Sequence, residues 1–462
     1  MTLPDKKVFI KTYGCQMNVY DSNKMIDILA PLGYTPTERP EVADMVVINT
    51  CHIREKASEK TFSELGRLSL FKKRKQAIGQ DMVIAVTGCV AQAEGEEIQR
   101  RAPFVDIVVG PQTYHRLGAM VKDVLSTKKK NLDIEFPVES KFDFLPEKSL
   151  IQGVSAFLSV QEGCDKFCSF CVVPYTRGVE YSRSVSDILA EAQRLVDHGA
   201  REIVLLGQNV NAYHGEALSS NKINENLNNI GTQTECNLAG LLKYLDKIEN
   251  IKRLRYTTSH PLDMTQDLIN VHQSIEKLMP FLHLPVQSGS NAVLQRMNRQ
   301  YSVDDYYKII NELRKVRSDL ALSSDFIVGF PGETDRDFKQ TIELIQNIEF
   351  AQAYSFKYSI RPGTPGSLMD DQVEEHVKTE RLEELQALLK QQQKNYNQKF
   401  VHQKLPVLFE KQGKYKNQYV GKTPYMQSVH VESKENLIGH LKEIWIAESH
   451  SNSFKGQLMG DM

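Results

Sequence analysis

Three cysteines lie within eight residues in the segment GCDKFCSFC (163–171), with the spacing Cys164-x3-Cys168-x2-Cys171. Three thiolates on one tight turn can hold three corners of an iron–sulfur cube, whereas thiolate-rich metal sites usually have four cysteine ligands. The missing fourth ligand would leave one iron free to bind another molecule. A zinc knuckle with a distant fourth ligand, or buried thiols without a metal, are the alternatives that the spacing leaves open.

A second set of cysteines ends three apolar runs in the first third of the chain. The runs cover 7–15, 44–51 and 82–89 and end at Cys15, Cys51 and Cys89. An open parallel α/β sheet binds ligands at the carboxyl ends of its strands. We therefore expect these three thiols to lie close together and to form a second metal site. The alternative is that three small thiols are simply buried at strand ends.

Helical segments must separate these strands and position the cysteines. One such segment is 21–33, where Asp21 and Ser22 are suited to cap the amino end and Gly33 the carboxyl end. A fourth apolar run, 105–110, ends in glycine. The alternation predicts an open parallel α/β sheet for this part of the chain.

The middle of the chain repeats the alternation on a larger scale. Strand-like runs occupy 156–164, 202–210, 253–261, 281–289, 322–332 and 353–360, with helical periodicity over 186–199, 238–248, 267–279, 304–316 and 335–348. Six parallel strands with helical crossovers favour a barrel or an incomplete barrel over an open doubly wound sheet, and spacing alone leaves both open. In such barrels the loops after the strands build the active site. The 163–171 loop follows the first strand and belongs to that face.

Composition places the chain among ordinary globular proteins. It has 462 residues, 41% hydrophobic and 25% charged, and a formal net charge of −1. This length corresponds to about two to four domains. Because no signal peptide or membrane span is recognisable, we expect a cytoplasmic location and no membrane partner. Seven cysteines in that compartment argue for metal binding rather than for disulfides.

The rest of the chain adds an insertion, a long helix and a small barrel. The Asn-rich stretch 215–236 reads as a loop insertion, and Cys236 at its end as a free thiol. A long helix is expected over 371–400, followed by short alternating strands typical of a small β-barrel. Residues 401–430 hold five lysines against one acid, with Tyr415, Tyr419 and Tyr425 interleaved. This composition suits a nucleic-acid surface, although a solvated lysine-rich hairpin is nearly as good an interpretation.

The 164–171 loop resembles the Cys-x3-Cys-x-aromatic-Cys motif of the radical S-adenosylmethionine (SAM) enzymes, with Phe170 at the aromatic position. The resemblance implies that SAM chelates the open iron of a [4Fe-4S] cluster. An electron from the cluster then cleaves SAM to a 5′-deoxyadenosyl radical. The segments LLGQNV (205–210) and FIVGFPGE (326–333) are similar to the glycine-containing segments that approach SAM. Gly207 is therefore a candidate cofactor-binding residue, although an ordinary barrel turn explains these glycines about equally well.

The surroundings of the other three cysteines resemble the methylthiotransferase family. YGCQMNVYDS (13–22), NTCHIREKA (49–57) and TGCVAQ (87–92) carry the likeness, which continues through CVVPYTRGVEYSR (171–183) and LPVQSGSNAVLQRMNR (284–299). In that family Cys15, Cys51 and Cys89 would hold a second [4Fe-4S] cluster. We read His52 as a neighbour rather than a ligand, since successive side chains of a strand point in opposite directions.

The resemblance also implies a fold and a division into domains. The expected α/β fold has an open parallel N-terminal sheet (1–128, with the auxiliary cluster), a partial (βα)6 TIM-like radical SAM core (150–383) and a small all-β TRAM barrel for RNA (385–455).

The motifs look most like the branch of the family that acts on N6-dimethylallyladenosine of tRNA, 3′ of the anticodon. The implied reaction is 2-methylthiolation at C2, with sulfur from the auxiliary cluster and a methyl group from a second SAM. A flavodoxin or ferredoxin would supply electrons to a monomeric enzyme. Two alternatives remain open, namely another branch (threonylcarbamoyl-adenosine or a ribosomal-protein aspartate) and a non-enzymatic iron–sulfur carrier.

Overall fold

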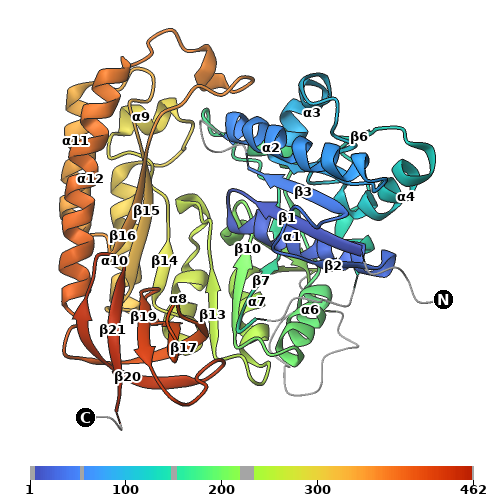
Figure 1. Ribbon diagram of the computed structural model, residues 1–462. Coiled ribbons are helices and arrows are strands. Elements are labelled where there is room, and N and C mark those ends of the chain that lie inside the picture. Colours follow the sequence, from blue (N-terminus) through green and yellow to red (C-terminus); the bar gives the residue numbers. More distant parts are fainter. Residues whose placement is uncertain (1–5, 52–56, 147–152, 219–233, 460–462) are drawn as a thin grey trace. The chain divides into compact units, whose positions relative to one another are not determined.

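The computed structural model describes residues 6–51, 57–146, 153–218 and 234–459. The chain divides into two compact units, which are described separately (Figure 1). The first comprises Met1–Ile151, Glu162–Asp165 and Val172–Tyr181, and the second comprises Gln152–Gln161, Lys166–Cys171 and Ser182–Met462. The three-cysteine loop therefore contributes Cys164 to the first unit and the other two cysteines to the second.

The first unit is built on a six-stranded parallel sheet with the order β2-β1-β3-β4-β5-β6. Its strands are β1 (Lys6–Thr12), β2 (Tyr34–Pro36), β3 (Met45–Thr50), β4 (Val83–Gly88), β5 (Ile107–Val109) and β6 (Asn131–Asp133). The expected parallel sheet is confirmed. The three-residue edge strands β2 and β6 were not predicted, because so short a segment has no measurable alternation.

Helices cover both faces of this sheet (Figure 1). The helices of the unit are α1 (Gln16–Leu29), α2 (Ala57–Ala77), α3 (Cys89–Arg101), α4 (Leu117–Thr127) and the short α5 (Val173–Arg177). Alternate residues of β3 enter different cores. Met45 and Val47 pack with residues of α1 and α4, whereas Val46 and Ile48 pack with residues of α2 and α3. Burial on both faces explains why the strands read as continuous apolar runs.

Helix α1 begins earlier than predicted. Cys15, not Asp21, occupies the amino-terminal cap position, and Asp21 lies buried within the helix. The expectation that Asp21 and Ser22 cap the helix is therefore wrong, because the Asp21 carboxylate is bound by an arginine instead of by backbone amides. Gly33 ends the segment in the left-handed conformation (φ 83°), as predicted.

The second unit contains two three-stranded parallel sheets, β7-β10-β13 and β14-β15-β16. The strands are β7 (Ser155–Ser159), β10 (Glu202–Leu206), β13 (Arg253–Tyr256), β14 (Phe281–His283), β15 (Ala321–Val328) and β16 (Gln352–Lys357). A parallel bridge between Leu254 and Leu278 joins β13 to the segment that precedes β14. The six predicted strands are all present, and they follow one another in sequence order across the two sheets.

Helices alternate with these strands and surround one large apolar core. They are α6 (Val185–Asp197), α7 (Leu238–Asp246), α8 (Gln266–Ser274), α9 (Asn291–Arg296), α10 (Val303–Val316), α11 (Asp335–Ile348) and α12 (Glu375–Gln398). Capping boxes start α10 and α11, through Ser302 with Asp305 and Thr334 with Asp337. The short α9 was not predicted. The long α12 lies along β16 and α11 (Figure 1).

Short strands stand at two further places in the chain. β8 (Gln161–Glu162) and β9 (Tyr181–Ser182) occur where the chain passes between the units. β11 (His214–Glu216) and β12 (Glu235–Asn237) pair antiparallel at the two ends of the Asn-rich insertion. Residues 219–233 of that insertion lie outside the described residues.

The second unit ends in a closed barrel with the strand order β17-β18-β19-β21-β20. Its strands are β17 (Lys404–Gln412), β18 (Gln418–Lys422), β19 (Ser428–Glu432), β20 (Leu441–Ser449) and β21 (Ser453–Leu458). Val407, Phe409, Val429, Ile444 and Phe454 form part of its core. The predicted small β-barrel is confirmed as a five-stranded closed sheet.

Two buried arginines of β13 connect the core strands to this barrel. Arg253 donates to the carbonyl oxygens of Lys422 (2.6 Å) and Pro406 (2.7 Å). Arg255 donates to those of Pro424 (2.8 Å) and Thr423 (3.1 Å). The barrel is therefore fixed to the core by four hydrogen bonds from charged donors.

The barrel does not present all three predicted tyrosines to solvent. Tyr419 is buried in the barrel core. Tyr425 stacks on Phe400, with ring centroids 4.9 Å apart, and its hydroxyl donates to Asp319. Tyr415 alone of the three is well exposed (66%). The expected row of three stacking tyrosines is wrong, because β-strand alternation turns Tyr419 inward and Tyr425 packs against the end of α12.

The fold is a mixed α/β fold with parallel sheets and a C-terminal five-stranded barrel. None of the helices in the described ranges has the length and apolarity needed to cross a membrane.

Candidate functional site

Cys15, Cys51 and Cys89 follow the carboxyl ends of the three adjacent strands β1, β3 and β4. The Cys51 thiol is hydrogen-bonded to both of the other thiols. The structure therefore brings together three residues that are 36 and 38 positions apart in the sequence, as the parallel sheet predicted. His52 lies outside the described residues.

Two glycines make this close approach possible. Gly14 has φ +116°, and a Cβ atom on it would lie 2.2 Å from the Cβ of Cys51. Gly88 has φ +89°, and its Cβ would lie 2.3 Å from the carbonyl oxygen of Thr50. A side chain at either position would push the strand ends apart. The Gly-Cys pairs at 14–15 and 88–89 were a signal in the sequence for this packing.

Arg177 of α5 gives the three-thiol group its electrostatic character. Hydrogen bonding from Cys51 and the positive charge of Arg177 lower the pKa values of Cys89 and Cys15. The pKa of Cys51 is raised well above its usual value, because it is hydrogen-bonded to the other two thiols. Lowered pKa values favour thiolates, and the thiolate is the form that binds metals. The residue types and the lowered pKa values of Cys15 and Cys89 therefore favour thiolates, the form that an iron–sulfur group requires.

Arg177 belongs to a buried network of four charged residues, all in the first unit. It pairs with Asp21 (Nη2 to Oδ2, 2.7 Å) and with Glu162, and Lys141 donates to Glu162 (2.8 Å). All four side chains are at most 2% exposed. Two positive and two negative charges balance, as burial of ions requires. Sequence reasoning missed this network, because its members come from four separate segments.

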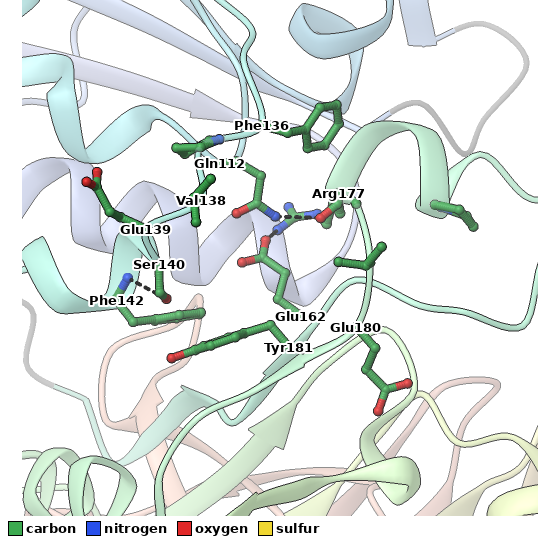
Figure 2. A pocket seen from close by; sticks show the side chains of 14 residues that line it. Gln112, Phe136, Val138, Glu139, Ser140, Phe142, Glu162, Arg177, Glu180 and Tyr181 are labelled. Carbon is green, nitrogen blue, oxygen red and sulfur yellow. Dashed lines mark hydrogen bonds and ion pairs between the residues drawn. The ribbon is translucent and has the colours of Figure 1, made fainter.

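A pocket of about 410 Å³ lies beside this network (Figure 2). Phe136, Val138 and Val179 contribute apolar surface to it. Figure 2 also shows Phe142 alongside Tyr181, whose ring centroids are 6.1 Å apart and whose planes differ by 11°. Arg177 and Glu162 belong to its lining, whereas no cysteine does among the residues described. The pocket is thus adjacent to the charged network and not to the thiols themselves.

In the first unit, the three-cysteine loop begins at a constrained turn. The amide of Cys164 donates to the carbonyl oxygen of Gly178 (3.3 Å). Gly163 has φ +76°, and a Cβ atom on it would lie 1.9 Å from the carbonyl oxygen of Val179. Glycine is therefore required immediately before Cys164.

In the second unit, the remainder of the loop is fixed by α9 and the residues after it. Ser169 donates from its amide to the backbone carbonyl oxygen of Met297 (3.0 Å) and from its hydroxyl to the backbone carbonyl oxygen of Arg296 (2.8 Å). The amide of Cys171 donates to the carbonyl oxygen of Cys168 (2.9 Å), which closes the turn. The sulfur of Cys168, which is buried, accepts a hydrogen bond from Arg299 Nη1 (3.4 Å).

Phe170 and Gly207 were predicted to contact the cofactor, and both remain predictions. Phe170 packs against an apolar cluster that includes Met297 and Phe330. Gly207 approaches Gln161 so closely that a Cβ atom would lie 2.4 Å from its Oε1. That oxygen accepts hydrogen bonds from the two amides after the glycine. Packing on Gln161 is thus a sufficient local reason for Gly207.

Three buried polar atoms near the ends of β10 and β13 have no hydrogen-bond partner among the described residues. They are Asn209 Oδ1, Ser259 Oγ and His260 Nε2. Burial lowers the pKa of His260 to about 2, so its ring is neutral. Buried polar groups are normally paired, and these atoms lie beyond the carboxyl ends of parallel strands, where parallel α/β sheets bind ligands. They fit a polar cofactor such as SAM, and sequence reasoning did not identify them.

In the part of the chain that is described, no group of three or more His, Cys, Asp or Glu side chains is arranged to hold a metal ion. The six cysteines therefore remain predicted ligands.

Two known protein families match the two parts of the chain that carry the cysteine groups. Residues 7–110 match the family described as uncharacterized protein family UPF0004, and residues 158–345 match the radical SAM superfamily. A tRNA-2-methylthio-N(6)-dimethylallyladenosine synthase of Rickettsia bellii is 55% identical over 98% of this chain and 99% of its own length. The enzyme of the same name from Rickettsia conorii is 54% identical over 98% of this chain and 100% of its own length. The chain belongs to the family of the tRNA-2-methylthio-N(6)-dimethylallyladenosine synthases. As a radical SAM family member it uses SAM and an iron–sulfur cluster.

Solved structures share the fold at much lower sequence identity. The radical SAM methyltransferase TsrM of Kitasatospora setae has a TM-score of 0.56, with 10% identity over 79% of this chain and 75% of that chain. The cobalamin-dependent SAM radical enzyme OxsB has a TM-score of 0.53, with 13% identity over 84% of this chain and 56% of that chain. At this identity the likeness concerns the fold alone.

Proposed function

We propose that this protein methylthiolates C2 of N6-dimethylallyladenosine at position 37 of tRNA, giving the 2-methylthio derivative. The relatives that carry this activity in their names match 98% of the chain at 54–55% identity, and this observation carries the proposal. The buried polar atoms without hydrogen-bond partners at the ends of β10 and β13 argue against a cluster carrier without enzymatic activity, because such a carrier binds no polar cofactor there.

Two [4Fe-4S] clusters would be held by the two cysteine groups. Cys164, Cys168 and Cys171 would bind the cluster that chelates SAM, and Cys15, Cys51 and Cys89 the cluster that provides sulfur. When bound, these groups supply the electron, the carbon radical and the sulfur that substitution at an unactivated C2–H requires. Asn209, Ser259 and His260 would bind polar atoms of SAM, since their buried groups are otherwise unsatisfied.

We also propose a division into domains, a surface that contacts tRNA and an electron donor. The order of the six core strands supports a partial TIM-like barrel over 150–383, after an N-terminal domain over 1–128. The terminal barrel, over 385–455, would be a TRAM domain that contacts tRNA. We assign that contact to the hairpin of β17 and β18, where Lys411 at the end of β17 and Lys414, Tyr415 and Lys416 in the turn are exposed. A flavodoxin or ferredoxin would donate electrons to a monomer in the cytoplasm.

Nucleoside analysis tests the proposal. The gene would be deleted, and tRNA from the strain would be digested and analysed by mass spectrometry. We expect loss of the 2-methylthio derivative, accumulation of N6-dimethylallyladenosine and recovery on complementation. Loss of a methylthio group from threonylcarbamoyl-adenosine or from a ribosomal protein would assign the chain to another branch of the family.

A second test uses the purified, iron-loaded protein and two matched tRNAs. Burial of the five-carbon dimethylallyl group is worth about 4 kcal/mol at about 0.8 kcal/mol per carbon. The tRNA that lacks this group should therefore be a much poorer substrate. Equal turnover of both tRNAs would contradict the proposed substrate.

A further inference from the structure

A buried arginine contacts the sulfur of Cys168. Besides the 3.4 Å hydrogen bond from Nη1 to that sulfur, Arg299 donates from Nε to the Tyr301 hydroxyl (3.0 Å) and from Nη2 to the carbonyl oxygen of Pro285 (2.8 Å). Its guanidinium also lies 5.2 Å from the centre of the Tyr301 ring. The residue is only 5% exposed. Its charge is therefore held in one place with little water to screen it.

Among the described residues, the groups that act most strongly on the charge of Arg299 are Tyr301 and Cys168, and neither is a carboxylate. The groups around it are the neutral oxygens of Tyr301 and Pro285, the neutral ring of His260 and the sulfur of Cys168. An isolated buried cation is costly, and a thiolate is the one partner here that can offset that cost.

Arg177, near the other cysteine group, is in the opposite situation. It is paired with Asp21 and Glu162, and the network that includes Lys141 is neutral as a whole. The two cysteine groups are therefore each next to a buried arginine, but only Arg299 brings net positive charge.

We propose that Arg299 is a positioning residue that raises the reduction potential of the iron–sulfur group held by Cys168. The inference rests on the proposed function, in which Cys164, Cys168 and Cys171 hold the cluster that chelates SAM. Reduction adds a negative charge to that group, and a fixed cation in a low-dielectric site stabilises the reduced form more than the oxidised one. A hydrogen bond to a ligand sulfur acts in the same direction.

The charge effect can be separated from a structural role with two substitutions. Arg299→Gln removes the charge and keeps an amide donor, whereas Arg299→Lys keeps the charge and loses the planar set of donors. Arg296→Gln is the matched control. Its side chain is partly exposed, pairs with Asp371 and touches no cysteine among the described residues.

The test is a redox titration of the full-length, iron-loaded protein, followed by electron paramagnetic resonance. The signal that changes when SAM is added identifies the cluster of the 164–171 loop. We expect Arg299→Gln to lower the midpoint potential of this cluster and to leave that of the other cluster unchanged. Arg299→Lys should retain most of the wild-type potential, and Arg296→Gln should retain all of it.

Each other outcome is decisive. A fully loaded Arg299→Gln protein with the wild-type potential overturns the proposal. If Arg299→Gln does not load iron, Arg299→Lys decides: an unchanged potential supports the charge effect, and a lowered potential overturns it. Failure of both variants to load iron also overturns it, because Arg299 is then needed only for folding of the loop. Absence of a SAM-sensitive cluster in the wild-type protein would instead refute the proposed function.

Discussion

Replacement of Arg255 by methionine should loosen the C-terminal barrel from the core. Arg255 makes two hydrogen bonds to barrel carbonyl oxygens and pairs with the buried carboxylate of Glu202 (Nε to Oε2, 2.8 Å). Methionine fills a similar volume but leaves that carboxylate without its cation. Breaking a buried pair from one side costs about 3–5 kcal/mol, which is a large part of the stability of a domain.

The neighbouring Arg253 supplies the comparison. It also donates to two barrel carbonyl oxygens, but it forms no hydrogen bond to a carboxylate among the described residues. Arg253→Met should therefore cost less, about 1–3 kcal/mol, which corresponds to the lost hydrogen bonds alone. The double variant Arg255→Met/Glu202→Gln should regain part of the loss, roughly 1–3 kcal/mol, because no buried charge is left unpaired.

The assay is urea denaturation followed by the fluorescence of Trp445. This is the only tryptophan of the chain and lies on β20 of the barrel, so its signal reports the barrel transition. If the double variant were no more stable than Arg255→Met, the unpaired Glu202 would not be the cause of the loss, and the reasoning would be refuted.

The ion pair between Arg255 and Glu202 also makes the stability of the protein depend on pH. Burial opposes ionisation of Glu202, but Arg255 lowers its pKa below the usual value by attraction and by hydrogen bonding. A lowered carboxyl pKa contributes stability above the unfolded-state pKa of about 4.3, and this stability is lost as the pH falls. In Arg255→Met the unpaired, buried Glu202 should have a raised pKa instead. The difference in stability between wild type and variant should therefore shrink at acidic pH.

Three further predictions concern the cysteines and the charged network. Lys141→Met should lower the free energy of unfolding by about 3–5 kcal/mol, because Glu162 loses a buried cation; thermal denaturation measures this, and a shift within error would contradict the network. Gly14→Ala should displace Cys51 and reduce iron content while SAM cleavage persists, as measured by iron assay and 5′-deoxyadenosine release; full iron content would show that the strand ends can yield. Cys236, whose pKa burial raises to about 11, should react with iodoacetamide at pH 8 about a hundredfold more slowly than a free cysteine; equal rates would mean that its thiol is accessible.

Much of the site could be predicted from the sequence, because the relevant information is local. Cys15, Cys51 and Cys89 each follow a buried apolar run, and parallel strands necessarily meet at one edge. The three-cysteine motif needs only one turn of chain. Apart from the short α9, the β-strands and α-helices of the core were also predicted, since burial on one or two faces leaves a period in the sequence.

Contacts between distant residues were decided only by the tertiary structure. Arg299 lies 131 residues from Cys168, and Arg177 lies 156 residues from Asp21. Arg255 meets the barrel across 168 residues, at the carbonyl of Thr423. Periodicity reports how strongly a position is buried, but it carries no information about which charge lies opposite.

The same limit explains the wrong predictions. Asp21 has the residue type of a helix cap, yet the buried Arg177 binds its carboxylate and places it within α1. Tyr419 has the residue type of a stacking platform, yet its register in β18 turns it into the barrel. Residue type and spacing therefore determined which chemistry the chain can carry and which strand ends carry it. Packing between elements determined the charges that act on the thiols, because an electrostatic interaction depends on distance in space and not on distance along the chain.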